Sequence, residues 1–196
     1  QSFFEGIQDK VDVLDERVCF RNFDGLDLTG FIDGTENPQF PDDRAATTLL
    51  SEDAGVFADG SFIFAQRYCH DLEKWKKLKV DAQEQVFGRT KLESIELDDD
   101  VKPENSHVAR VVVEDDEGEE MEILRHSLPY GDGKGEQGLF FIAYTKDLNI
   151  IDAMLLRMFG TSGDGIHDRM LHFVTPVDGA YYFAPSEELL EEVLEG

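Results

Sequence analysis

The sequence predicts an α+β fold in which helices cover one face of an antiparallel sheet. Five segments rich in β-branched and aromatic residues alternate with segments of helical composition. An acidic turn with a glycine, DDEGEE, separates two of the strand-like segments, which is typical of a hairpin. The chain has 196 residues, of which 41% are apolar and 11% aromatic, so it can bury a sizeable core.

The first half of the expected fold is a strand, a helical region and a hairpin. Residues 60–68 (GSFIFAQRY) are rich in β-formers after a glycine and predict a strand. Residues 71–87 have helical composition up to Gly88. Residues 107–115 (HVARVVVED) and 121–129 (MEILRHSLP) are the two expected arms of the hairpin.

The second half repeats the alternation. Residues 138–146 (GLFFIAYTK) predict a strongly apolar strand. Residues 148–159 carry only two charges, which predicts a helix buried on most sides. Residues 180–185 predict a last strand, and residues 186–195 predict a helix with Ser186 as its N-cap.

From residue 60 onward the order is β-α-β-β-α-β with one extra strand near the middle, which is the ferredoxin-like split βαβ arrangement. The uncovered face of such a sheet needs a ligand, a cofactor or a missing partner domain, and the sequence does not choose among them. Residues 1–29 show no clean period and begin without an initiator Met. They are expected to be a linker or the end of a preceding domain, and residues 30–196 are expected to be the ferredoxin-like domain.

Charge and cysteine content narrow the function classes. Lys and Arg number 18 against 43 Asp and Glu, a net charge of −25 that disfavours nucleic acid and anionic membranes as partners. No apolar window is long enough to span a membrane, and the first residues lack a signal-peptide pattern. Two cysteines, Cys19 and Cys69, are too few for a disulfide scaffold, so a reducing cytoplasm is the expected location.

Histidine spacing argues against a zinc enzyme built on a helix, because none of the five histidines forms an HxxxH or HExxH pair. His107 is expected at a strand entrance, with Ala109 and Val111 on its own face. Small and aliphatic neighbours would let a flat cofactor approach the imidazole. The alternative is a histidine that is only hydrogen-bonded at the end of a strand.

Asp33 is the second candidate, in the segment GFIDGTENP. Gly30 and Gly34 flank the carboxylate, so a ligand could approach the backbone closely. A carboxylate among apolar groups resists ionisation and can act as an acid or a base. An Asp–Gly turn is the alternative interpretation.

Two cationic positions stand out in this acidic chain. Strand alternation places Ile123, Arg125 and Ser127 on one face, and an inward-facing arginine needs an anionic partner. Arg89, in the segment FGRTK, could bind carboxylate groups of a ligand. The alternative for Arg125 is a structural ion pair, and the alternative for Arg89 is a solvated surface turn.

Five segments taken together, GFIDGTENP, FGRTK, NSHVARV, LRHSLPYG and YYFAPS, closely resemble the dye-decolourising peroxidases, and in particular their bacterial cytoplasmic branch. The similarity runs in family order from about Leu28 to Leu190. It implies two ferredoxin-like domains in tandem, with haem b (iron protoporphyrin IX) held in the C-terminal one. The chain would then be that C-terminal portion, and the N-terminal half of the same protein would be one of its partners.

Carried over by position, the resemblance implies a set of roles for individual residues. His107 would be the proximal ligand of the haem iron, Asp33 the distal acid/base and Arg125 the distal cation. Ser127 matches a distal polar position where some relatives carry Asn. Arg89 lies in a shared motif, and its expected role as a partner of the haem propionates is inferred from its charge.

Three further expectations concern the surroundings of the cofactor. Gly34 and Thr35, next to Asp33, are expected to contact it. Some relatives support the proximal histidine with an acidic residue near the motif before the last strand. In this sequence the segment MLHF offers His172 at that place, which leaves the supporting contact open.

The implied activity is reduction of hydrogen peroxide coupled to one-electron oxidation of aromatic donors such as dyes and phenols. A homo-oligomeric protein is also expected. The alternative is a haem carrier or an iron-releasing haem-handling protein in which peroxidase activity is incidental. A third hypothesis is a ferredoxin-like interaction module without a cofactor.

Overall fold

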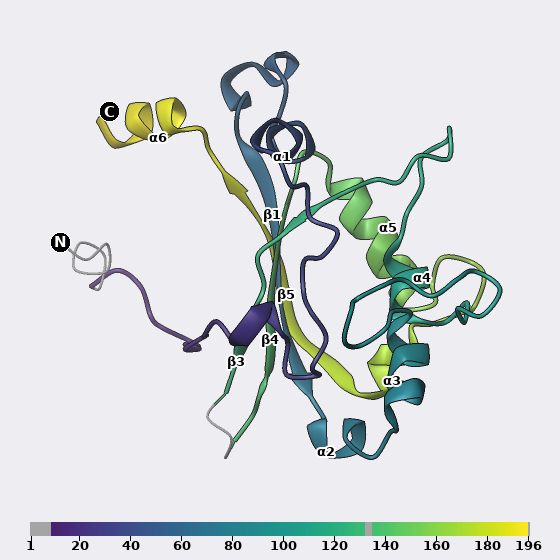
Figure 1. Cartoon of the computed structure of the whole chain (residues 1–196). Coiled ribbons are helices and arrows are strands. Elements are labelled where there is room, and N and C mark those ends of the chain that lie inside the picture. The colour runs from purple at the N-terminus through teal and green to yellow at the C-terminus, as the bar shows by residue number, and fades with distance from the viewer. Residues whose placement is uncertain (1–8, 132–134, 196) are drawn as a thin grey trace.

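A computed structural model of the chain, which describes residues 9–131 and 135–195, contains an antiparallel sheet with helices along one face (Figure 1). The strands are β1 (Ser61–His70), β2 (Leu124–Arg125), β3 (Leu128–Tyr130), β4 (Gly138–Thr145) and β5 (Val174–Ala184). Their order is β2-β4-β1-β5, and β3 also pairs with β4. With β2 and β3 taken as one interrupted strand, this is the split βαβ order, so the predicted fold class is confirmed.

The α-helices are α1 (Pro41–Thr48), α2 (Leu72–Trp75), α3 (Val80–Phe87), α4 (His107–Val111), α5 (Leu148–Met158) and α6 (Glu187–Glu195). The described residues also contain the 3₁₀ helices η2 (Phe23–Gly25), η3 (Glu52–Phe57) and η4 (Arg169–His172). Helices α3, α4 and α5 lie on the same side of the sheet, and α6 projects away beyond the end of β5 (Figure 1). Among the described residues, no helix is both long and apolar enough to cross a bilayer.

The predicted strand over residues 107–115 is wrong, because residues 107–111 form helix α4. Ser106 caps this helix by accepting a hydrogen bond from the backbone N–H of Ala109 at 3.4 Å. The place beside β4 is taken by β2 and β3, which pair with it in one register. Only an isolated bridge between Glu114 and Glu120 remains of the expected hairpin, so the extra strand does not exist.

Two expected helices differ in detail from the structure. The expected helix over residues 71–87 is divided into α2 and α3, and α3 ends at Gly88, whose φ of +93° a side chain would disfavour. Helix α5 is less buried than its composition predicts, because Leu156 is 49% exposed while Ile150 and Ile151 are buried. One face of α5 therefore packs on the sheet and the other reaches solvent.

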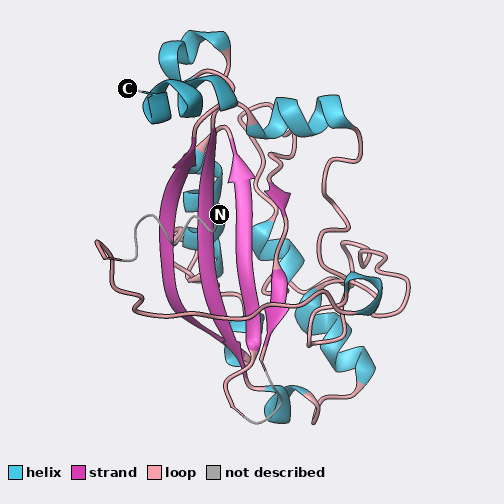
Figure 2. Cartoon of the chain, turned by 90° about the vertical axis from the view of Figure 1, so that its left-hand side faces the viewer, coloured by secondary structure: helices cyan, strands magenta, loops and turns pink. Residues whose placement is uncertain are grey.

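The sheet face opposite the helices is crossed by the N-terminal segment (Figure 2). Cys19 forms an isolated bridge with Tyr130, and the backbone N–H of Phe20 donates to the carbonyl of Pro129 at 3.0 Å. Arg67 of β1 is buried below this segment and forms ion pairs with three carboxylates. These carboxylates are Asp15, Glu136 and Asp178. The chain thus covers part of the second face with its own residues.

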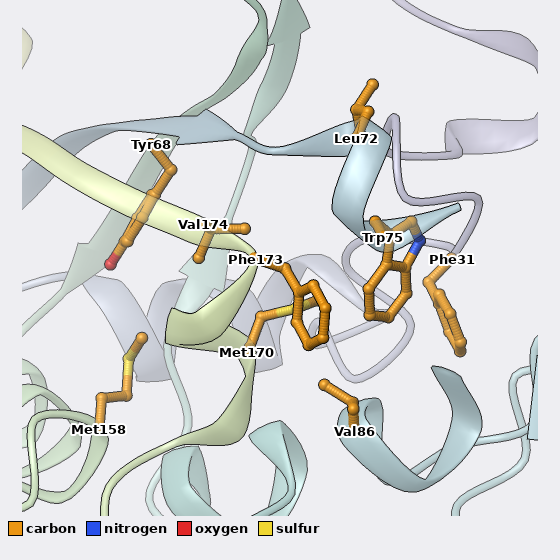
Figure 3. Close-up of a cluster of buried hydrophobic side chains, with 9 residues drawn as sticks. All are labelled: Phe31, Tyr68, Leu72, Trp75, Val86, Met158, Met170, Phe173 and Val174. Atoms are coloured by element: carbon orange, nitrogen blue, oxygen red, sulfur yellow. The ribbon is translucent and has the colours of Figure 1, made fainter. Parts of the chain in front are cut away.

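The core below α2 is centred on Trp75, which is 2% exposed (Figure 3). Its ring lies between Phe31 and Phe173, with centroid distances of 6.1 and 5.1 Å. Its indole N–H donates to the carbonyl oxygen of Thr29 at 2.9 Å. Trp75 therefore ties the segment before Asp33 to the body of the domain.

Truncation of Trp75 tests this core. We expect Trp75→Ala to lower the free energy of unfolding by about 3–5 kcal/mol, because it leaves a cavity and removes the indole hydrogen bond. Urea unfolding followed by far-UV circular dichroism measures the change. The control Tyr182→Ala, at a side chain that is 57% exposed, should stay within about 0.5 kcal/mol. Equal losses in the two variants would contradict this assignment of the core.

Candidate functional site

A cavity with largely apolar walls lies between the sheet and the helices that cover it. Its sheet wall includes Phe64, Tyr68 and Phe141. Its helix wall comes from α3, α4 and α5, including Phe87, Val108, Val111, Met154, Leu155 and Met158. Asp33, Arg125 and His107 line the same cavity. The fold therefore brings three of the sequence-predicted site residues together from a loop, a strand and a helix.

His107 is the first residue of α4, and a buried carboxylate fixes its ring. Its Nδ1 atom lies 2.6 Å from Oδ2 of Asp168, which has 0% exposure. The other oxygen of Asp168 accepts the backbone N–H of Met170 at 2.7 Å. Because Asp168 occupies Nδ1, the ring has Nε2 left for a ligand in the cavity.

Asp33 and Arg125 form the polar part of the cavity wall. Nε of Arg125 lies 3.9 Å from Oδ1 of Asp33, and both side chains are about one-quarter exposed. The side chain of Asn37 holds the arginine's backbone from both sides: it accepts the N–H of Arg125 at 2.9 Å and donates to the Arg125 carbonyl at 2.7 Å. Asn37 thus fixes the loop that carries Asp33 against strand β2.

Gly34 and Thr35 connect Asp33 to the clamp that Asn37 forms with its two hydrogen bonds to the backbone of Arg125. Gly34 has a φ of +77°, and a Cβ atom there would lie 2.7 Å from Nδ2 of Asn37. A side chain would therefore disturb both the backbone and the clamp. Thr35 lines the cavity, as the sequence analysis expects of a residue that contacts a cofactor.

Ser127 lies two residues after Arg125, between strands β2 and β3, which pair with β4 in one register. Arg125 pairs with Ala143 and Leu128 with Phe140, so Ser127 lies opposite Phe141, a cavity residue. Its Oγ atom is buried and has no hydrogen-bond partner among the described residues. A buried hydroxyl without a partner is costly. Ser127 itself is not among the residues that line the cavity, so its contact with a ligand there stays a prediction.

Arg89 also lines the cavity, but protein groups already engage its guanidinium. It donates to the carbonyl of Ser94 at 2.7 and 2.9 Å and pairs with Glu36 at 2.5 Å. Glu36 is 60% exposed at its side chain, so it can move away when another anion binds Arg89. Arg89 is therefore placed where a carboxylate-bearing ligand could compete for it.

The exposed edge of the cavity is acidic. Glu120 lines it, and burial raises the pKa of its carboxyl, with a further contribution from four neighbouring carboxylates. The four are Glu36, Glu96, Glu122 and Glu114. Like charges at this edge repel an approaching anion.

His70 is a second imidazole on the cavity wall that the sequence analysis did not single out. Burial lowers the pKa of His70 and the Asp27 carboxylate, 3.7 Å from its Nδ1, opposes that shift. Nδ1 of His70 has no hydrogen-bond partner among the described residues. The His70 ring therefore lacks the anchoring that Asp168 gives to His107.

The sequence left open which residue supports His107, and the structure places Asp168 at that position. His172 lies on the surface beside His167, and Asp168 supplies the contact to His107. Sequence reasoning missed Asp168 and Asn37. Asp168 precedes η4 as its N-cap, a role that the segment HDRM is compatible with but does not single out. Asn37 lies in the family segment GFIDGTENP, in which only Asp33, Gly34 and Thr35 were given roles.

Comparison with known proteins agrees with this site. A family model described as the C-terminal part of Dyp-type peroxidases matches residues 24–189. The chain belongs to the Dyp-type peroxidase family. The dye-decolorizing peroxidase of Mycobacterium tuberculosis is 47% identical over 184 residues, which cover 93% of this chain and 55% of that protein. The chain therefore spans about half the length of such curated relatives.

A solved structure of a DypB variant from Rhodococcus jostii in complex with haem shares the fold. The two have a TM-score of 0.90 and 43% identity, over 96% of this chain and 61% of that one. A more distant relative is the deferrochelatase of Escherichia coli K12, which is 26% identical over 81% of this chain. The relatives of this chain thus include proteins named dye-decolorizing peroxidase and proteins named deferrochelatase.

Substitution of Asp168 tests the carboxylate that anchors His107. We expect Asp168→Ala to lower the free energy of unfolding by about 2 kcal/mol, because it leaves the N–H of Met170 and Nδ1 of His107 buried without a partner. Asp168→Asn should cost less than half as much, since its amide oxygen still accepts one of these bonds. Urea unfolding of the two variants measures both losses. No loss in the alanine variant would mean that Asp168 does not hold this part of the domain.

Proposed function

We propose that the protein is a haem peroxidase that reduces hydrogen peroxide and oxidises aromatic donors such as dyes and phenols by one-electron steps. The observation that carries this proposal is the content of one cavity. It contains an imidazole anchored by a buried carboxylate, His107 with Asp168, and an acid–cation pair, Asp33 with Arg125. The first pair suits iron ligation and the second suits peroxide chemistry.

The residues of the cavity fit a haem. Nε2 of His107 is the free nitrogen of a ring whose tautomer Asp168 fixes, and a carboxylate partner makes a histidine a stronger donor to a metal. Aromatic and aliphatic side chains such as Phe87 and Met154 provide the apolar walls that a porphyrin needs. The haem complex of the Rhodococcus relative supports the same cofactor for this chain.

When bound, the haem iron supplies the electrons that break the O–O bond of peroxide. Asp33 can take the proton from one peroxide oxygen and give it to the other, since its carboxylate lines the cavity. Arg125 keeps its positive charge close to Asp33 and offsets the negative charge that develops on the departing oxygen. Asn37 positions Arg125 through the two hydrogen bonds to its backbone.

The remaining predicted residues have supporting roles in this proposal. The unpartnered hydroxyl of Ser127 hydrogen-bonds peroxide or the water that precedes it. Gly34 and Thr35 form the part of the loop that contacts the edge of the cofactor. Arg89 binds a haem propionate in exchange for Glu36.

The alternative, a haem carrier or iron-releasing protein, is less well supported. The deferrochelatase relative is 26% identical, against 47% for the mycobacterial peroxidase. A carrier also has no need for the Asp33–Arg125 pair in its cavity. A cofactor-free interaction module would leave the buried polar atoms of Ser127 and His70 without a purpose.

We also propose features of the whole protein. The family model describes a C-terminal part, and the curated relatives are about twice as long as this chain, which supports an N-terminal half joined through residues 1–29. Residues 1–8 lie outside the described part of that segment. Exposed apolar side chains on α6, such as Val193, support self-association into a homo-oligomer. The free cysteines Cys19 and Cys69 support a cytoplasmic location.

Loss of the proximal ligand is the first functional test. We expect His107→Ala to abolish stable haem binding, because Nε2 of His107 is the anchored donor in the cavity. The matched control is His70→Ala, which removes the other imidazole of the cavity wall and should keep the Soret band. Haem titration followed by absorbance compares the variants. A full Soret band in His107→Ala, or loss of the band in His70→Ala alone, would mean that His70 and not His107 is the ligand of the haem iron.

Substitution of Asp33 or Arg125 separates haem binding from the reaction of the bound haem with peroxide. We expect Arg125→Leu to keep haem but to slow the reaction with peroxide about 100-fold, equivalent to ~3 kcal/mol of lost charge stabilisation. Asp33→Asn should cost about 10–100-fold, because water can carry part of the proton traffic. Stopped-flow absorbance measures both rates. An unchanged rate in Arg125→Leu would remove this role from the arginine.

The acidic edge of the cavity predicts how salt and pH act on different substrates. At pH 7 we expect added salt to lower KM for a sulfonated, anionic dye and to leave a neutral phenol unaffected, because salt screens exposed charges. Dye turnover should be fastest below neutrality. Because burial and the neighbouring carboxylates raise the pKa of Glu120, its carboxylate loses its charge at a higher pH than an ordinary glutamate does. Steady-state kinetics with both substrates test this, and salt that slows both alike would contradict it.

A further inference from the structure

Two surface histidines outside the cavity lie close enough to share one ligand. His167 comes just before Asp168, the N-cap of η4, and His172 is the last residue of η4. Their Nε2 atoms are 3.1 Å apart, and the ring centroids are 5.3 Å apart with the planes at 49°. The five-residue spacing matches no helical zinc motif, but the short 3₁₀ helix between the two rings brings them together.

This separation suits a transition-metal ion. Zinc–nitrogen bonds are about 2.0–2.1 Å long, so two nitrogens 3.1 Å apart would subtend about 100° at the metal. That angle lies between the ideal octahedral and tetrahedral values. In the absence of an ion, the same two nitrogens lie within hydrogen-bond distance of each other, which keeps both rings close together.

The surroundings leave room for such an ion. Both rings are exposed, so water can fill the other coordination positions. The ammonium group of Lys74 donates a hydrogen bond to the backbone carbonyl oxygen of His172 at 2.8 Å, and this bond leaves the ring nitrogens of His172 unused. The net charge of −25 raises the local concentration of cations around the chain.

We propose that Nε2 of His167 and Nε2 of His172 form a two-histidine site for a transition-metal ion such as Zn²⁺, Ni²⁺ or Cu²⁺. Imidazole prefers these ions over Mg²⁺ and Ca²⁺, which take oxygen ligands. Within residues 9–131 and 135–195, no group of three or more potential ligands gathers, so water completes the coordination. The site is independent of the cavity and of the proposed peroxidase activity.

The position of the site has a structural consequence. The segment between the two histidines begins with Asp168, which holds Nδ1 of His107. An ion that joins His167 to His172 therefore closes a short loop around η4 and restrains the carboxylate inside it. Backbone amides of residues 168–172 should exchange hydrogen more slowly when zinc is bound.

Isothermal titration of the untagged, haem-loaded protein with ZnCl₂ tests the proposal. We expect one tight equivalent above the weak background of 43 acidic side chains. His167→Ala and His172→Ala should each weaken that equivalent at least about tenfold, because loss of a direct ligand costs no less than loss of its supporting partner. MgCl₂ should give the weak background alone.

The matched control is His126→Ala, which removes another exposed imidazole, one that lies edge-on to the ring of Tyr144 and outside the His167–His172 pair. It should bind zinc like the unchanged protein. An unchanged Soret band and circular dichroism spectrum in each variant show that the fold is intact. Zinc binding that is equal in all four proteins, or matched by Mg²⁺, would overturn the proposal by assigning the ion to carboxylates.

Discussion

The contact between His107 and Asp168 is the constraint on which the candidate site depends. It joins the first residue of α4 to the N-cap of η4, although the two are 61 positions apart in the chain. Helix α4 has only five residues, and the guanidinium of Arg157 on α5 holds it further by donating to the carbonyl of Ala109 at 2.7 Å. A helix this short has little stability of its own. The position of the His107 ring thus comes from tertiary contacts.

A second constraint holds the other polar groups of the cavity. Asn37 binds both backbone polar groups of Arg125, and the positive φ of Gly34 lets the chain turn between Asp33 and that clamp. The loop is fixed from its other end by the contacts of Trp75 with Phe31 and Thr29. The ferredoxin-like sheet therefore acts as a support: strand β2 carries Arg125, the loop clamped to it carries Asp33, and helix α4 carries His107. The cavity lies on the covered face of the sheet, between the strands and the helices.

The sequence predicts strands β1 and β4 and helix α5 because their hydrophobic patterns are long and regular, and the order of the elements along the chain predicts the split βαβ arrangement. It fails at residues 107–115, where β-branched valines favour a strand but the Ser106 cap and the occupied edge of β4 select a helix. Local sequence motifs identify Asp33 and Arg125 as candidate site residues. Local motifs do not identify Asp168, because it meets His107 from 61 positions away in the chain. They do not identify the His167–His172 pair either, because two residues brought together by the path of a 3₁₀ helix leave no periodic signal in the sequence.

The absorption spectrum of the haem-loaded protein, recorded before and after one equivalent of hydrogen peroxide, tests the central claim most directly. The claim is that one cavity combines an anchored proximal imidazole with a distal acid–cation pair. The account predicts a Soret band of histidine-ligated haem that shifts within seconds of mixing and returns when a phenol is added. A protein that takes up no haem, or a Soret band that peroxide leaves unchanged, would contradict it.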